Sequence, residues 1–126
     1  MSWDVSYREH DTDIVVHRMS WTSDGSGDTT EVSPKAVSGQ IERVVFLHGD
    51  ADNLYDITLT DPDGIDVLAG LGGNLAVADD LNTSPGTPLL DGTTTSVRPM
   101  VVNGILTLTV SNAGASKSGE VVLYVR

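Results

Sequence analysis

The residues best able to do chemistry in this sequence are aspartates grouped in two short segments. One segment is Asp61-x-Asp63-Gly64-x-Asp66, and the other is Asp50-x-Asp52-Asn53-x-x-Asp56. Each places several hard oxygen atoms on a tight turn, and such oxygens are the ligands that Ca²⁺ prefers. Neither completes an EF-hand loop, because the bidentate Glu of the twelfth loop position is missing. Aspartate is also common in turns because its side chain hydrogen-bonds nearby backbone. We therefore favour turn formation, and we keep five residues as weak Ca²⁺ candidates: Asp50, Asp52, Asp61, Asp63 and Asp66.

Motifs for covalent catalysis or cofactor binding are missing from the sequence. There is no cysteine and no Gly-x-Ser-x-Gly elbow for a nucleophilic serine. The three histidines, His10, His17 and His48, do not have the spacing of metal ligands. Gly70-Leu71-Gly72-Gly73 is not followed by the Gly-Lys-Ser/Thr of a phosphate-binding loop. A pair of carboxylates for glycoside hydrolysis would need an aromatic-lined cleft, and aromatic residues are few. We predict a protein that is not an enzyme and that has no cofactor.

Two tryptophans suggest a binding role instead. Trp3 and Trp21 would suit a sugar-stacking platform, as in carbohydrate-binding β-sandwiches. Alternatively they plug the ends of a sandwich or lie in an oligomer interface, where tryptophan is enriched. We favour the second interpretation, and we take Trp3 and Trp21 as interface candidates.

Composition and charge narrow the class of protein. The chain has 126 residues, which suits one domain, and it is 39% hydrophobic. Its 18 acidic and 7 basic residues give a net charge of −11, which repels phosphate backbones. We therefore expect no direct nucleic-acid partner. The acidic surface indicates either ordinary solubility or adaptation to high salt.

Residues 1–13 are too polar for a signal peptide, and apolar runs are strand-sized, so we expect no membrane segment.

Strand patterns run through the whole chain. Apolar or β-branched runs, several of them alternating with polar residues, are separated by clusters of turn formers. This predicts an all-β fold, an antiparallel β-sandwich, jelly roll or small barrel of about eight strands. The expected strands are residues 14–21, 29–32, 41–47, 54–60, 65–68, 96–102, 105–111 and 120–126.

The turns between these strands predict their connections. Asp61-Pro62-Asp63-Gly64 suits a type I turn and would make residues 54–68 a hairpin. Asn103-Gly104 is the preferred pair of a type I′ hairpin, so the last three strands would form a meander. Pro99 cannot donate a backbone hydrogen bond, and its strand is expected at a sheet edge or with a bulge.

Three segments do not fit the strand pattern. Residues 74–81 would form at most one short helix, capped by Asn74. Residues 82–95 are rich in Thr, Pro, Gly and Ser, and they predict a long surface loop that contacts other proteins. Residues 1–13 are polar and would form an N-terminal docking arm that orders on assembly.

Over residues 15–126 the chain resembles small virion-associated proteins of tailed phages and related archaeal viruses. The resemblance rests on the motifs Trp21-Thr22-Ser23-Asp24-Gly25-Ser26-Gly27, Gly39-x-Ile41-x-Arg43-Val44-Val45-Phe46, Tyr55-Asp56-Ile57-Thr58-Leu59-Thr60-Asp61-x-Asp63-Gly64-Ile65-Asp66-Val67-Leu68, Gly72-x-Asn74-Leu75, Gly92-Thr93-Thr94-Thr95, Arg98-Pro99, Val102-Asn103-Gly104 and Val121-Val122-Leu123-Tyr124.

The resemblance implies a virion structural protein made in the host cytoplasm. The first expectation is a decoration (cement) or turret-base protein that binds the major capsid protein on the outside of the head, as a trimer or pentamer. Edge strands would make the contacts, and Arg98 and Pro99 join the interface candidates. The alternatives are a tail, neck or fibre-associated virion protein, and a carbohydrate- or calcium-dependent binding module.

Overall fold

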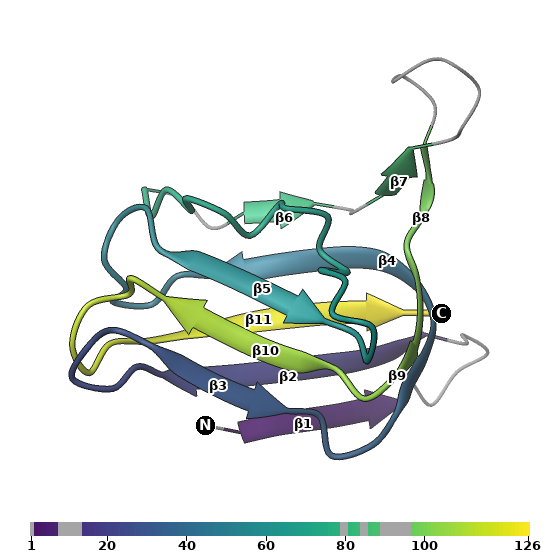
Figure 1. Ribbon diagram of the computed structural model, residues 1–126, viewed down its shortest axis with the longest axis horizontal. Coiled ribbons are helices and arrows are strands. Elements are labelled where there is room, and N and C mark those ends of the chain that lie inside the picture. Colours follow the sequence, from purple (N-terminus) through teal and green to yellow (C-terminus); the bar gives the residue numbers. More distant parts are fainter. Residues whose placement is uncertain (1, 8–13, 79–80, 84–85, 89–96) are drawn as a thin grey trace.

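The computed structural model describes residues 2–7, 14–78, 81–83, 86–88 and 97–126. The described residues form strands, turns and bends, without a helix. This confirms the all-β prediction (Figure 1). The strands are β1 (Ser2–Tyr7), β2 (Val15–Thr22), β3 (Thr29–Val32), β4 (Val37–Leu47), β5 (Asp56–Thr60), β6 (Leu81–Thr83), β7 (Gly86–Pro88), β8 (Val97–Pro99), β9 (Val101–Gly104), β10 (Thr107–Ser111) and β11 (Ser118–Val125). No helix of the described residues is long and apolar enough to cross a membrane.

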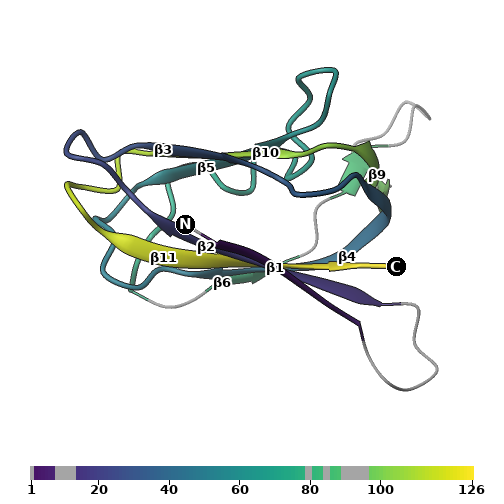
Figure 2. The same cartoon turned by 90° about the horizontal axis from the view of Figure 1, so that it is seen from below.

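Two antiparallel sheets lie face to face (Figure 2). The large sheet has the order β1-β2-β11-β4-β6, and β9 also pairs with β4. The small sheet has the order β3-β10-β5, and a separate ribbon consists of β7 and β8. Every pair is antiparallel, so each strand can bury one face and leave the other in water.

The core lies between the two sheets, and alternation along the strands supplies it. On β10, Leu108 and Val110 are buried, while Thr107 and Thr109, which alternate with them, are partly exposed. On β2, Met19 and Trp21 face inward and Arg18 and Thr22 face outward. The largest fully buried side chains are Trp21, Tyr55, Phe46, Met19, Ile41, Ile57, Leu59, Leu68, Leu106, Leu108, Leu123 and Val44.

β4 closes one side of the sandwich because it pairs with three strands. Its first half, from Val37 to Gln40, pairs with β9, and its second half pairs with β6 and β11. Within the first half Gly39 has φ 131°, which favours glycine, and β4 curls towards the small sheet (Figure 2). The opposite side, between β1 and β3, ends in the terminal strands of the two sheets.

Three loops cross between the sheets at one end of the molecule: residues 23–28, 48–55 and 112–117. Backbone hydrogen bonds connect them, from Ser23 N–H to the Lys117 carbonyl, from Ala113 to Gly27 and from Asp52 to Ala113. Residues 112–117 join β10 to β11, but these strands lie in different sheets, so the predicted meander is wrong.

The prediction of a hairpin at Asn103-Gly104 is wrong. Both residues belong to β9 and pair with β4, Asn103 opposite Ser38 and Gly104 opposite Val37. β10 then pairs with β3 and β5 in the other sheet. Gly104 has φ 141°, and a Cβ there would lie 2.6 Å from Pro62 Cγ, so close packing also requires this glycine. Pairing with β4, which is distant in the sequence, therefore outweighs the preference of Asn103-Gly104 for a two-residue turn.

The helix expected over residues 74–81 is not formed in the part that is described. Asn74 has φ 50°, and Leu75 makes an antiparallel bridge with Tyr55. Leu75 is buried in the core, and its backbone bonds with Leu54 and Tyr55 replace those of a helix too short to be stable alone. Leu81, the last residue of that range, begins β6.

Four further segments can be placed. Within the predicted arm, residues 2–7 form β1 on the edge of the large sheet, and residues 8–13 lie outside the described residues. The turn at Asp61–Gly64 forms, but 65–68 adds only a bridge between Thr60 and Asp66.

The loop expected over 82–95 contains parts of β6 and all of β7, and 84–85 and 89–95 are not described. Pro99 lies in a two-stranded ribbon, which confirms its edge position.

Candidate functional site

The first aspartate group holds its turn together through the backbone. Asp61 Oδ1 accepts hydrogen bonds from the N–H groups of Asp63 and Ile65, at 2.9 and 3.0 Å. Asp66 Oδ1 accepts from Leu59 and Leu68, and its Oδ2 accepts from Gly70. These oxygen atoms are used by backbone donors of the loop that follows β5, as expected for turn chemistry.

The second group connects the crossing loops to the neighbouring strands β5 and β11 by hydrogen bonds. Asp50 Oδ1 accepts from Ser118 N–H at 2.6 Å, and Asp56 accepts from Asn74 N–H and from the Asn112 side chain. Asp52 lies close to Gly114, where an added Cβ would meet its carboxylate. Asp24 acts in the same way in the first crossing loop, and hydrogen bonds from the Asp28 and Ser26 amides hold its pKa below the usual value. Within the described ranges, no three acidic or histidine side chains gather as a metal site would require.

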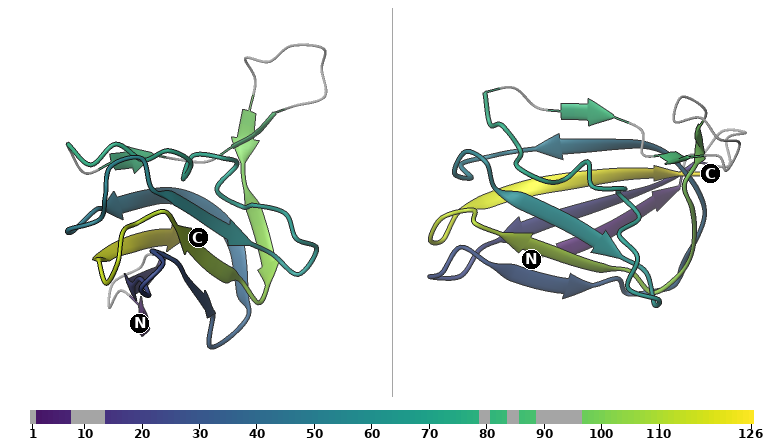
Figure 3. Two further views of the ribbon diagram at one scale, coloured as in Figure 1. Left: turned by 60° about the vertical axis from the view of Figure 1, so that its left-hand side comes forward. Right: turned by 45° about the horizontal axis from the view of Figure 1, so that its top comes forward.

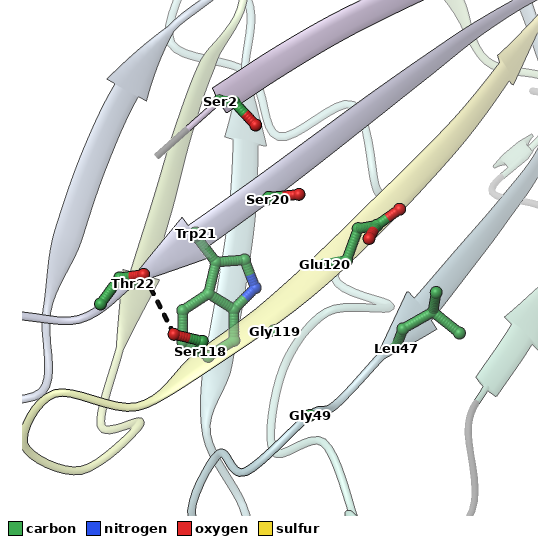
Figure 4. A pocket seen from close by; sticks show the side chains of 9 residues that line it. All are labelled: Ser2, Ser20, Trp21, Thr22, Leu47, Gly49, Ser118, Gly119 and Glu120. Atoms are coloured by element: carbon green, nitrogen blue, oxygen red, sulfur yellow. Dashed lines mark hydrogen bonds between the residues drawn. The ribbon is translucent and has the colours of Figure 1, made fainter.

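Trp21 is part of the core, beneath the groove that Figure 4 shows. Its side chain is 1% exposed, and its ring lies 5.6 Å from the Tyr55 ring, centroid to centroid. Gly119 on β11 faces it, and a Cβ there would lie 2.5 Å from Trp21 Cζ2. The interface prediction for Trp21 is therefore corrected: the residue plugs the end of the sandwich beneath the crossing loops, because its neighbour across the sheet has no side chain.

Trp3 lies on the inner face of β1, where it contacts His17 of β2. Its indole N–H donates to His17 Nδ1 at 3.0 Å, and the two rings meet edge to face. His17 is buried, and this burial lowers the pKa of its imidazole below 6.5. Together with Val5, Pro34, Lys35 and Ala36, these residues line a cavity of about 270 Å³, which we call the Trp3 cavity. It lies between β1 and the connection from β3 to β4.

Arg98 and Pro99 lie on β8, in the ribbon that β8 forms with β7. Arg98 pairs with Thr87 and Pro99 with Gly86. Figures 1 and 3 show that the ribbon stands away from the two stacked sheets, beside the upper end of β9. Of the predicted interface residues, Arg98 and Pro99 therefore lie on the ribbon that projects from the two sheets.

A shallow groove crosses the outer face of the large sheet (Figure 4). It has a volume of about 630 Å³, and small polar residues from three strands border it: Ser2, Ser20, Thr22 and Ser118. Thr22 and Ser118 hydrogen-bond to each other at 3.0 Å, and Glu120, which also lines the groove, forms an ion pair with Arg18. The groove offers hydroxyl groups and one paired carboxylate.

Comparison with protein-family models, curated proteins and solved structures finds no match.

Among the residues around the Trp3 cavity, Val5 and His17 were missed as candidates. A signal for Val5 was present in Ser2–Tyr7, where Trp3, Val5 and Tyr7 alternate with Ser2, Asp4 and Ser6. The polar and charged residues 8–13 follow this short strand, and they led to the prediction of a polar arm over the whole of residues 1–13. His17 stands among apolar residues of a predicted strand, and its contact with Trp3 depends on the pairing of β1 with β2.

Proposed function

We propose that the protein is a structural component of a tailed-virus particle, a decoration (cement) or turret-base protein on the outside of the head. The resemblance over residues 15–126 motivates this role. The net charge of −11 supports it, because an acidic surface suits the outside of a capsid better than contact with packaged DNA. The aspartates support a structural role as well, since their oxygen atoms stabilise loops.

The observation that carries the proposal is the projecting ribbon of β7 and β8. A two-stranded ribbon is marginally stable by itself, and this one stands outside the main core (Figure 3). Each strand has one partner among the described strands, so each presents a second backbone edge. Pro88 and Pro99 lack a backbone N–H, so an extended segment of the major capsid protein would pair with such an edge only away from these prolines. Arg98 and Pro99 lie on this element.

The rigid sandwich would connect several such contacts. A contact made by a few backbone hydrogen bonds is weak, but two or more contacts on one body act at high effective concentration. The decorator would then hold neighbouring capsid proteins together and oppose the outward pressure of the genome. In this arrangement the core and the crossing loops stabilise the domain, and the ribbon of β7 and β8, which makes the contact, lies outside them.

The test replaces residues 86–99 with a short Gly-Ser linker in the virus that encodes the protein. We expect the variant to remain folded but to be lost from purified particles, and those particles to break at lower temperature or milder osmotic shock. Asp63→Ala, in an exposed turn outside the ribbon, is the matched control and should retain full occupancy.

Quantitative mass spectrometry of the particles gives the readout. Hundreds of copies per particle would support a head decorator, whereas a dozen or fewer would place the protein in the neck or tail. Wild-type occupancy and wild-type capsid survival of the linker variant would contradict the proposed role of the ribbon. Absence of the wild-type protein from particles would contradict the virion role as a whole.

The groove in Figure 4 favours one second candidate, a module that binds a small polar ligand such as a carbohydrate. Hydroxyl groups of Ser20, Thr22 and Ser118 would hydrogen-bond to such a ligand. Titration calorimetry with host-surface glycans, with and without Ca²⁺, tests it: stoichiometric binding that is lost in Ser20→Val would favour this candidate over the decorator.

A further inference from the structure

β1 ends the large sheet with an unused backbone edge. It pairs with β2 on one side, from Ser2 opposite Ser20 to Tyr7 opposite Val15, and no other described strand pairs with it. Every second residue of such a strand directs its N–H and C=O groups away from its partner. β1 therefore presents a six-residue edge with backbone donors and acceptors ready for another strand.

The other sheet ends are shorter or covered. β3 has four residues and is followed by Pro34 and Lys35. β5 is covered by the loop that bridges back beside it at Tyr55 and Thr60. Opposite β1 the large sheet ends in β6 and β9, which pair with β4 and have three and four residues. In natural monomers, edges are protected by proline, lysine or an inward-facing charge. β1 has none of these, because its one charged residue, Asp4, is exposed on the outer face opposite Arg18.

The inner face of β1 is also incompletely covered. Val5 is 37% exposed although it faces the core side of the sheet. Trp3 and Val5 line the Trp3 cavity together with the connection from β3 to β4. A second strand placed along β1 would therefore cover apolar surface in addition to forming backbone hydrogen bonds.

We infer that β1 pairs with β1 of a second copy, antiparallel and around a twofold axis, so that the two large sheets become continuous. In an antiparallel pair, directly opposite residues have their side chains on the same face of the sheet. Trp3 and Val5 face inward and have odd numbers, so odd-numbered residues must oppose odd-numbered residues, and the two numbers of each pair must have an even sum. The register centred on Val5 satisfies this: Val5 opposes Val5, Asp4 opposes Ser6, and Trp3 opposes Tyr7. The register centred on Asp4 would place two carboxylates opposite each other and is disfavoured.

A second copy fits this edge better than an unrelated segment because the strand is complementary to itself. Its alternating pattern places apolar residues opposite apolar residues and Asp4 opposite an uncharged residue. Local charge permits the contact, since Arg18 and Lys35 lie close to β1. An isologous contact closes at two copies. The free protein is therefore a dimer, in contrast to the trimer or pentamer that the resemblance implies.

The first test measures the mass of the free protein by light scattering and sedimentation equilibrium at moderate salt, over a range of concentrations. We expect a dimer that Val5→Lys converts to a monomer, because an inward-facing charge would lie beside its own copy in the pair. Val101→Lys is the matched control: Val101 is 68% exposed on β9, at the far side of the large sheet, and the variant should remain dimeric.

The second test uses the absence of cysteine from the chain. In Val5→Cys the only thiols of a dimer would lie opposite each other, about 4.5–5.5 Å apart at Cα, within the range that a disulfide spans. We expect rapid oxidation to a covalent dimer. In Asp4→Cys the two thiols would be diagonal and about 7–8 Å apart at Cα, so cross-linking should be slow.

A monomeric mass at all concentrations would overturn the inference. A dimer that persists in Val5→Lys, or one that cross-links through Asp4→Cys faster than through Val5→Cys, would overturn the assignment to this edge and register. These measurements need no virus particle, so their failure is distinguishable from failure of the proposed virion role.

Discussion

The hydrogen bond from Trp3 to His17 requires a neutral imidazole, because the Nδ1 atom that accepts it carries a proton in the charged form. Burial has the same consequence, since it lowers the pKa of the imidazole. His17 thereby connects the inner face of β1 to β2 most firmly at neutral pH.

We expect stability to fall with acidification through this residue. The folded-state pKa of His17 lies below the unfolded value of about 6.5, so the unfolded chain binds more protons below that pH. The contribution is therefore complete above the unfolded pKa and decreases as pH falls towards the folded pKa. Urea unfolding at several pH values should show a smaller loss of stability for His17→Gln than for the wild type over that interval. Parallel pH profiles for the two proteins would contradict the assignment.

Gly119 is required by the ring of Trp21. An added Cβ would lie 2.5 Å from Trp21 Cζ2 and 3.0 Å from the Leu47 carbonyl oxygen, and the Trp21 ring is buried. Gly119→Ala should lower the free energy of unfolding by about 1–3 kcal/mol, as overpacked cores do. Gly25→Ala is the control, since no atom lies within 4 Å of its Cβ position. Equal unfolding midpoints of the two variants would refute the packing argument.

At the scale of elements, Asp66 holds the loop of residues 66–75 along the edge of β5. Its carboxylate accepts three backbone hydrogen bonds, one from Leu59 on β5 and two from the loop. Asp66→Ala should cost about 1–3 kcal/mol because a partly buried donor loses its acceptor. Amide hydrogen exchange should accelerate at Leu68 and Gly70 in this variant and remain unchanged in Asp63→Ala. Protection that persists in Asp66→Ala would show that the loop is held by other contacts.

The positions of most strands were predictable from local pattern, but their partners were not. Residues 29–32 and 14–21 were placed within one residue because both segments are rich in β-branched residues and turn formers follow them. The Asn103-Gly104 prediction failed because a two-residue turn preference is worth less than pairing with β4 and burial of Leu106. Pairing between residues this far apart leaves no local mark in a single sequence.

The candidate residues show the same division. Aspartates that stabilise turns were recognisable from their spacing, since the bonds of Asp61 span two and four residues. The contact between Trp3 and His17 and the burial of Trp21 against Gly119 both depend on sheet register. Sequence patterns gave the residue types, and the order of strands in the sheets decided which of them meet.

At the scale of the whole molecule, charge opposes folding. A net charge of −11 on one compact domain produces self-repulsion, and five of the aspartates, Asp24, Asp28, Asp50, Asp52 and Asp56, lie in or beside the crossing loops. We expect the melting temperature to rise as NaCl increases from about 0.02 to 0.5 M, where the screening length shortens to a few ångströms. Differential scanning calorimetry provides the measurement, with sucrose of equal osmolality as the uncharged control. A melting temperature independent of salt would weaken the idea of adaptation to high salt.

The place of β11 in the middle of the large sheet governs when the protein can fold during its synthesis. β2 and β4 are each paired with β11 and not with each other, so the sheet is interrupted until Val125 has left the ribosome. Chains released before that point expose the apolar faces of both halves. Neither half of the large sheet can therefore be completed before β11 is available to both β2 and β4.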